Sequence, residues 1–455
     1  MAIESERLKV RERMSGREKW TLALLVLISV FLFADQNAMN PVVKEMMAEY
    51  QINEQQIGLV GSAFTILGAV VSIVFGYYTD NFSRKKLLAF VVLVGEIPCF
   101  LTGFRYFTGT YEQLMLLRIL TGIGIGGIFP ITFSLIGDYF EAKHRGIVTA
   151  LITTSWGIGQ IAGQAMAGML AVPFGWRFPF IVAAVPNFIL VPLFLLIAKE
   201  PKRGGKENEI SVLLEYGIEY NEKIKLSDIK KLFKNKTNIL GFLQGIPGSF
   251  PWGVLPFFLI PFYEDKGFSK EFATLLTVIL GMGACVGGIA GGYIGDLLYR
   301  KVPKHQPLFC AIMVALGVIP AYILVTMNLT PDMGMKAMLV PLVCVVLTGI
   351  VVTMPGPNIK AILINVNPPE FRGSAFGMHN LADSLGRGIG PFVGGVLITS
   401  FGYKAALLSG VFVWLPCAII YALMALTIDK DLGNLHLYLS EKGNQLKART
   451  NQIQA

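Results

Sequence analysis

The feature that most limits the possible folds is a series of long apolar segments that recurs along almost the whole chain. Segments of this kind match the thickness of a bilayer, which a helix of about 20 apolar residues crosses. Of the 455 residues, 53% are hydrophobic and 15% are charged, and no water-soluble domain needs so many such segments. The sequence therefore predicts an all-α membrane protein that crosses the bilayer many times.

The apolar segments predict twelve transmembrane helices. They are expected roughly at residues 19–43, 56–79, 86–106, 111–139, 145–171, 176–198, 238–263, 271–298, 306–327, 336–365, 372–400 and 403–427. A basic and polar segment, 199–236, interrupts them in the middle. The resulting plan is an N-terminal six-helix bundle at 19–198, a cytoplasmic linker at 199–236 and a C-terminal six-helix bundle at 237–428, with cytoplasmic tails at 1–18 and 429–455.

Basic residues indicate the orientation of these helices. They gather in the N-terminal tail, in "SRKK" after the second span, in "AKHR" after the fourth span and in the central linker. The opposite loops are short and poor in Lys and Arg, so the positive-inside rule places both termini in the cytoplasm. The net charge of +9 then belongs to the cytoplasmic face of a cell (inner) membrane, and a nucleic-acid partner is not needed to explain it.

The two halves repeat each other. The pattern Gly-Tyr-x-x-Asp-x-x-x-Arg-Lys begins at Gly76 and again at Gly292, 216 residues later. Glycines 168 and 175 recur at 395 and 402, a constant offset of 227 residues. Duplicated helix bundles of this kind are typical of secondary transporters.

Together, the twelve spans, the repeat and the duplicated motif resemble the major facilitator superfamily over essentially the whole chain. More narrowly, "FADQNAMNP" in the first span and "LLRILTGIGIGG" in the fourth resemble spinster-like lipid transporters. The resemblance implies two six-helix bundles related by a pseudo-two-fold axis, in a monomer that works by alternating access. It also implies an amphipathic, lipid-like substrate such as a lysophospholipid.

The resemblance further implies that the duplicated motifs form cytoplasmic latches that close the outward-facing state. A carboxylate near a helix N-terminus is stabilised by the macrodipole, which suits Asp80 and Asp296. The residues expected to act in gating are Gly76, Asp80, Arg84, Arg145, Gly292, Asp296, Arg300 and Arg372. For the neighbouring lysines 85, 86 and 301, the simpler interpretation is positive charge that orients the helices.

Ionisable residues inside a span are costly and each suggests a function. Asp35 in the first span and Arg118 in the fourth are predicted at matching depths. The resemblance implies that both spans line a central cavity, so we expect the two residues to meet as an ion pair or a proton-linked switch. A purely structural salt bridge is the alternative. Glu96, in a span that is peripheral in the family, is expected to be structural.

The C-terminal half carries Lys360 in the tenth span and His379, Asp383 and Arg387 at successive four-residue steps in the eleventh. If Lys360 neutralises Asp383, Arg387 is left to bind a carboxylate or phosphate bidentately. Alternatively, Asp383 pairs with Arg387 within the helix. His379 is expected to be a packed, hydrogen-bonding residue.

Uncharged polar residues extend the expected substrate site. The whole predicted set is Gln36, Asn37, Arg118, Gln160, Gln164, Gln244, Trp252, Lys360, Asp383 and Arg387, with Asp35 and Arg118 coupling transport to protons. Trp252 lies in a span rich in proline and aromatic residues, which suits helix bending and contact with an apolar part of the substrate.

Three classes of function remain to be compared. An enzyme is not expected, because the sequence has no zinc-protease helix, nucleophile elbow or phosphate-binding loop, and neither a cofactor nor a metal is predicted. A channel or receptor has no need for duplicated latches, so a secondary active, proton-coupled transporter is favoured. A small organic anion is the alternative to a lipid-like substrate, and a facilitator or receptor without ion coupling is the least favoured.

Overall fold

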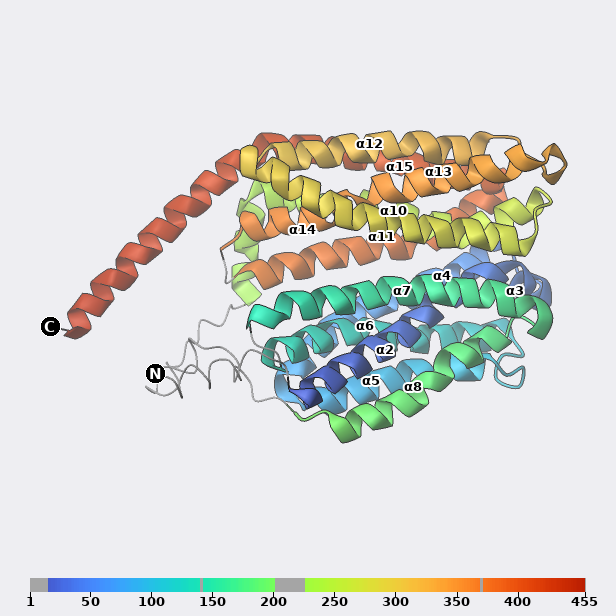
Figure 1. The fold of residues 1–455 in the computed structure, drawn as a ribbon, viewed down its shortest axis with the longest axis horizontal. Coiled ribbons are helices and arrows are strands. Elements are labelled where there is room, and N and C mark those ends of the chain that lie inside the picture. The colour runs from blue at the N-terminus through green and yellow to red at the C-terminus, as the bar shows by residue number, and fades with distance from the viewer. Residues whose placement is uncertain (1–14, 140–141, 201–225, 369–370, 455) are drawn as a thin grey trace. The chain divides into compact units, whose positions relative to one another are not determined.

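The computed structural model describes residues 15–139, 142–200, 226–368 and 371–454, and the secondary structure of these residues is helical (Figure 1). The chain divides into two compact units. Unit 1 comprises Met1–Ile52 and Ala63–Asn221, and unit 2 comprises Asn53–Ser62 and Glu222–Ala455. The first turns of one helix, α4, therefore group with unit 2, although the rest of that helix belongs to unit 1.

The helices of the first half begin with a capped helix. Ser15 caps it, because its hydroxyl accepts a hydrogen bond from Glu18 N at 3.2 Å while Glu18 Oε2 accepts one from Ser15 N at 2.8 Å. The helices are α2 (Gly16–Ala38), η1 (Asn40–Val42), α3 (Val43–Tyr50), α4 (Glu54–Asn81), α5 (Arg84–Thr102), α6 (Tyr111–Tyr139), α7 (Ala142–Phe174) and α8 (Phe178–Ile197). Helix α2 packs on α7 and α8, and α5 packs on α6 and α8.

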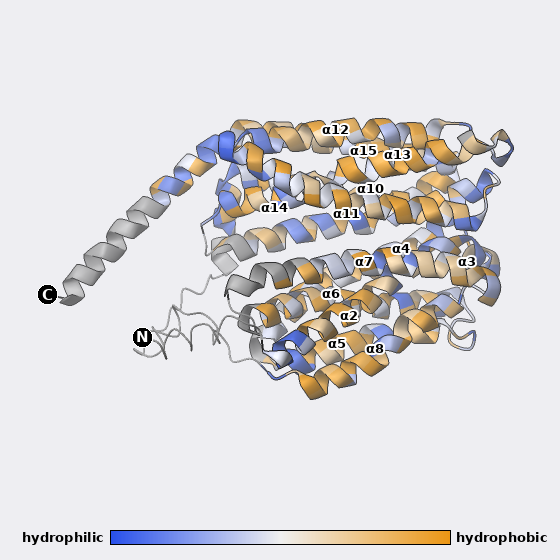
Figure 2. Cartoon of the chain, viewed as in Figure 1, coloured by the Kyte–Doolittle hydropathy of each residue, from blue (hydrophilic) through white to orange (hydrophobic). Residues whose placement is uncertain are grey.

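The second half follows the central linker. Its helices are η2 (Leu226–Lys234), α10 (Lys236–Asp265), α11 (Lys270–Lys301), α12 (His305–Thr326), η3 (Pro331–Met333), α13 (Met335–Thr353), α14 (Pro355–Asn365) and α15 (Arg372–Gln454). Helix α10 packs along α15, α11 along α13, and α12 along α15. Figure 2 shows hydrophobic residues along the helices and hydrophilic residues mainly near the helix ends, as a bilayer requires.

The observed helices follow the expected spans with three differences. The first span ends at Ala38, because the chain turns into η1 at Pro41. The expected helix 336–365 is divided into α13 and α14, with Pro355 opening the second helix. The last two expected spans form a single element, α15, that is bent at Gly402.

Within the described residues, nine helices are long and apolar enough to cross a membrane by themselves. One of them, 374–438, has a length of 65 residues and contains both of the last two expected spans. The chain is thus an integral multi-pass membrane protein, and the full count of twelve spans stays a prediction.

Backbone geometry supports the internal repeat. Gly175 and Gly402, predicted to correspond at an offset of 227 residues, have φ values of 83° and 81°. These values lie in the left-handed region that favours glycine. In each half the residue ends one apolar helical segment and begins the next, so the two positions make the same turn.

Glycines allow a close helix contact in unit 1. Gly159 and Gly163 of α7 lie against the carbonyl groups of Val30 and Ala34 in α2. A Cβ atom at Gly163 would overlap the carbonyl of Ala34, the residue before Asp35. This contact therefore holds the backbone that carries Asp35.

We expect Gly163→Ala to destabilise unit 1 by about 1 to 3 kcal/mol, because overpacking a close contact forces backbone shifts. Gly288→Ala in α11 is the matched control, since nothing lies within 4 Å of a Cβ at that position. Thermal melting of the purified variants in detergent measures both effects. Equal melting temperatures for the two variants would contradict this role of Gly163.

Candidate functional site

Asp35 and Arg118 form a buried ion pair in unit 1. Arg118 Nη1 donates to Asp35 Oδ1 at 2.7 Å, and each side chain is only 1% exposed. Asp35 comes from α2 and Arg118 from α6, as the matching depths of the two spans predict. The guanidinium also lies over the rings of Phe64 and Phe180, at 4.8 and 5.3 Å from their centroids.

The pairing of these two residues is incomplete within the described structure. Asp35 Oδ2 and Arg118 Nε are buried and have no hydrogen-bond partner there. A buried charge pair with unused donors and acceptors is held together mainly by the attraction of its two partners. Breaking this pair would therefore have a large effect on both side chains.

The other predicted residues of unit 1 differ in their burial. Gln164 of α7 is buried, and its Nε2 has no partner among the described residues. The side chains of Gln36, Asn37 and Gln160 are half-buried. The Oε1 atom of Gln36 is itself buried and has no hydrogen-bond partner among the described residues. No hydrogen bond of the described residues joins these amides to Asp35 or Arg118.

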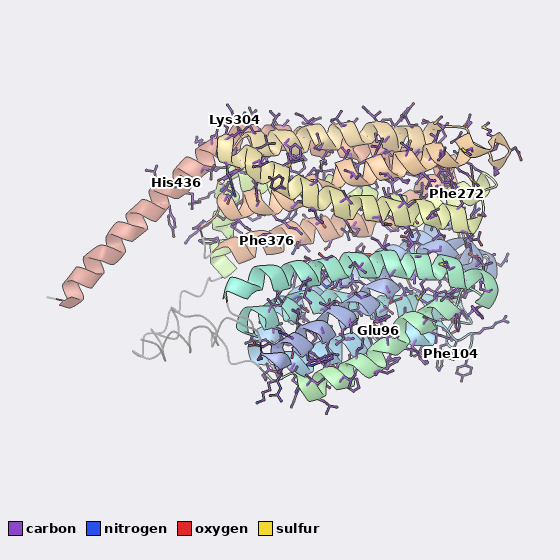
Figure 3. All side chains as sticks on the ribbon, viewed as in Figure 1. Glu96, Phe104, Phe272, Lys304, Phe376 and His436 are labelled. Carbon is purple, nitrogen blue, oxygen red and sulfur yellow. The ribbon has the colours of Figure 1, made fainter. Side chains whose placement is uncertain are left out.

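Glu96 of α5 has a buried polar partner on a neighbouring helix. It is fully buried in unit 1 (Figure 3), and Asn187 of α8 donates a hydrogen bond to Glu96 Oε1. Asn187 Nδ2 also donates to Ile28 O of α2 at 3.3 Å, so the two side chains join three helices. The structural role expected of Glu96 stays a prediction, and the sequence did not identify Asn187 as its partner.

Asp383 and Arg387 form the charged site of unit 2 on α15. Arg387 Nη2 lies 3.8 Å from Asp383 Oδ2, and the two side chains are 38% and 35% exposed. Asp383 Oδ1 also accepts a hydrogen bond from Ser249 of α10. Arg387 Nε is buried and has no partner within the described residues.

The structure thus favours one of the two pairings left open by the sequence. Asp383 pairs with Arg387 at a spacing of four residues, as the alternative interpretation expects. Lys360 is exposed on α14, and no ion pair of the described residues joins it to Asp383. His379 is buried, with Nδ1 at 3.2 Å from Gly241 O, which agrees with a packed, hydrogen-bonding residue.

Two predicted residues of α10 lie against the last part of α15. Gln244 is buried, and its Nε2 lies 3.7 Å from Cys417 Sγ. The rings of Trp252 and Trp414 meet edge to face with centroids 6.4 Å apart. Where α10 packs on α15, Gln244 and Ser249 contribute polar atoms, and Trp252 and Trp414 contribute aromatic rings.

Only part of the predicted gating set can be placed. The positions Gly76, Asp80, Arg145 and Arg372 lie outside the residues whose side chains are described. Arg84 is buried, and its Nη1 donates to Ser134 O at 3.4 Å, which joins α5 to α6. The side chains of Asp296 and Arg300 are exposed near the end of α11, and Gly292 faces Pro357 of α14.

Sequence reasoning did not identify the acid that caps α5. The Glu200 carboxylate accepts hydrogen bonds from Arg84 N at 2.9 Å, Lys85 N at 3.0 Å and the Ser83 hydroxyl. A carboxylate in this position is stabilised by the free N–H groups and the macrodipole of the helix. The signal in the sequence was an acid three residues after the end of α8, between Lys199 and Pro201.

The charged groups of the site offer no arrangement for a metal ion. Among the described residues, no group of three or more His, Cys, Asp or Glu side chains is close enough to hold one. What the site does offer is two ion pairs, a buried one in unit 1 and a partly exposed one in unit 2. Such groups can exchange a proton or bind an anion.

Known proteins resemble this chain in sequence. The cis,cis-muconate transport protein of Acinetobacter baylyi is 25% identical over 63% of this chain and 68% of its own length. The protein named "Probable galactarate/D-glucarate transporter" of Escherichia coli (strain K12) is 23% identical over 94% of this chain and 98% of its own.

A solved structure resembles it in fold. The inward-facing, unoccupied structure of a bacterial homolog to the human lysosomal transporter Spinster has a TM-score of 0.79 and 18% sequence identity, over 92% of this chain and 99% of that one. The family model described as Major Facilitator Superfamily matches residues 25–344 and 340–438. The chain therefore belongs to the Major Facilitator Superfamily.

Proposed function

We propose that the chain is a proton-coupled secondary transporter of an organic anion, working by alternating access as a monomer. Two of its relatives are named for the transport of cis,cis-muconate and of galactarate or D-glucarate, which are dicarboxylates. A substrate that carries carboxylates is therefore the first candidate. The transporter class follows from the family, and the chemistry of the site supports an anionic substrate.

The observation that carries the proposal is that Arg387 has hydrogen-bond donors that its partner Asp383 does not engage. Its Nη2 lies 3.8 Å from Asp383, which is too long for a hydrogen bond, and its Nε has no partner within the described residues. Asp383 is also engaged by Ser249. A partly exposed guanidinium with free donors can bind a carboxylate through two parallel hydrogen bonds.

The buried pair of unit 1 supports proton coupling. Asp35 accepts a hydrogen bond from Arg118 at 2.7 Å, and both side chains are buried. A conformational change that separates the pair would leave a carboxylate in an apolar surrounding, where protonation is favoured. Proton uptake at Asp35 would thus be linked to the change of conformation.

The remaining parts of the proposal concern gating and orientation. We propose that the two Gly-Tyr-x-x-Asp-x-x-x-Arg-Lys motifs latch the cytoplasmic side and that both termini lie in the cytoplasm of a cell (inner) membrane. The exposure of Asp296 and Arg300 leaves them accessible to partners. The distribution of Lys and Arg between the loops supports the orientation.

A lipid-like substrate such as a lysophospholipid is the second candidate. The segments "FADQNAMNP" and "LLRILTGIGIGG" favour it, because they resemble spinster-like transporters. Arg387 could then bind the phosphate, while the aromatic residues around Trp252 contact the acyl chain. The same arginine serves both candidates, so the neutral or apolar part of the ligand decides between them.

The proposal is tested by the binding of cis,cis-muconate and its neutral dimethyl ester to purified protein. A charge-assisted hydrogen bond contributes about 1.5 to 3 kcal/mol, so Arg387→Ala is expected to weaken muconate binding roughly ten- to a hundredfold. Arg387→Lys should restore only part of the loss, because lysine keeps the charge but not the planar fork. Binding of the ester should hardly change.

Lysophosphatidic acid, measured in parallel, represents the lipid candidate. If it binds through Arg387 and muconate does not bind, the lipid-like substrate replaces the small anion. If both anionic ligands and the ester weaken equally, or if Asp383→Asn rescues Arg387→Ala, Arg387 is a structural partner of Asp383. Circular dichroism of each variant confirms that it is folded.

A further inference from the structure

Two buried polar atoms of unit 1, on α5 and α8, have no partner within the described structure. They are Glu96 Oε2 and Asn187 Oδ1. They belong to side chains that already share one hydrogen bond, from Asn187 Nδ2 to Glu96 Oε1. Both free atoms are acceptors when Glu96 is ionised, so neither can satisfy the other.

A proton on Glu96 removes this mismatch. With the proton on Oε2, the carboxyl group becomes a donor, and Asn187 Oδ1 becomes its natural acceptor. Glu96 and Asn187 would then form two hydrogen bonds in a ring, with all four polar atoms used. Without the proton, a negative charge and two unsatisfied acceptors stay buried, which is the more costly arrangement.

The packing of α5 places Glu96 beside the helix that carries Asp35. Asn187 Nδ2 donates to Ile28 O of α2 at 3.3 Å, and a Cβ atom at Gly95 would lie 3.4 Å from Leu32, one turn before Asp35. Helix α8 contributes no ionisable side chain between Phe178 and Ile197. Arg118 pairs with Asp35, so one proton on Glu96 leaves these three buried side chains without net charge.

We propose that Glu96 and Asn187 form a second proton site, which holds the coupling proton while Asp35 is paired with Arg118. In this arrangement Asp35 is ionised, Glu96 is neutral, and the cluster carries no net charge. When Arg118 leaves Asp35, Glu96 releases its proton and Asp35 takes one up, so the negative charge passes to Glu96. This second site extends the proposed proton coupling, and its role in transport rests on that proposed function.

Infrared spectroscopy of the purified full chain tests the proposal without any substrate. A protonated carboxyl group has a C=O band outside the absorption of the peptide backbone, and a detergent without carbonyl groups keeps that region clear. At neutral pH we expect wild type to show this band and Glu96→Gln to lose it. Glutamine keeps both hydrogen bonds to Asn187, so this variant should fold, and Glu112→Gln, which changes an exposed acid of α6, is the matched control.

Two further variants separate a proton site from a merely structural acid. Asn187→Leu should keep the band but move it to higher frequency, because the carboxyl group loses its hydrogen bonds. In Asp35→Asn the band should fade at lower pH than in wild type, since removing a nearby negative charge favours ionisation of the remaining acid. A structural acid that is independent of the pair would show no such change.

The outcomes are distinct from those of the substrate proposal. A band that Glu96→Gln leaves intact, or that Asp35→Asn abolishes while Glu96→Gln retains it, overturns the second proton site and places the proton on Asp35. A band that is unchanged in Asp35→Asn overturns the link between the two acids. None of these results depends on Arg387 or on which anion is carried.

Discussion

Replacing Asp35 with asparagine is expected to abolish uptake driven by a proton gradient, while exchange of substrate across the membrane continues. Asparagine is nearly isosteric with aspartate but cannot take up a proton. Exchange only needs the loaded carrier to change conformation, whereas net uptake against a gradient also needs the proton to be bound and released. The measurement is accumulation of labelled cis,cis-muconate in proteoliposomes, with a pH gradient for uptake and with internal muconate for exchange.

Glu112→Gln is the control for this experiment, because it removes an acid from the exposed first turn of α6. It should retain both activities. Equal loss of uptake and exchange in Asp35→Asn would assign Asp35 to binding or folding. If Asp35→Asn retains uptake, the coupling proton must bind to another group, and Glu96 is the next acid to replace.

Much of the fold could be predicted because a bilayer restricts the chain severely. Apolar length alone indicated the helices, and the offset between Gly175 and Gly402 indicated that the two halves make the same turn. The division of the expected helix 336–365 could not be predicted with the same ease. Proline at 355 is compatible with either a kinked helix or a new first turn, and the packing of the neighbouring helices decides between them.

The candidate site was predictable where depth along a helix was enough. Asp35 and Arg118 were expected at matching depths in the first and fourth spans, and they meet in the structure. In unit 2 the sequence allowed Asp383 to pair either with Lys360 on another helix or with Arg387, four residues later on the same helix. The structure forms the pair of Asp383 with Arg387. Spacing in the sequence says nothing about how far an exposed side chain such as Lys360 reaches.

The partners of Glu96 show where sequence reasoning ends. An acid within an apolar span is visible in the sequence, but its neutral partner Asn187 comes from a helix that begins more than eighty residues later. Glu200 is a similar case, since it caps a helix that starts at Arg84. Contacts between segments so far apart depend on the packing of whole helices.

Arg118→Met is expected to have the largest effect on stability. The substitution keeps an unbranched side chain between the rings of Phe64 and Phe180, but it leaves the Asp35 carboxylate buried without its counter-charge. Removing one partner of a buried pair typically costs about 3 to 5 kcal/mol. Thermal melting in detergent should therefore show a large fall in melting temperature at neutral pH.

The double variant Asp35→Asn, Arg118→Met separates this penalty from lost packing. With both charges removed, no orphaned carboxylate remains, so most of the melting temperature should return. The double variant should therefore melt at a clearly higher temperature than Arg118→Met alone. If both variants melt alike, Arg118 stabilises unit 1 through its contacts with the two rings, and the charge of Asp35 is balanced by another group.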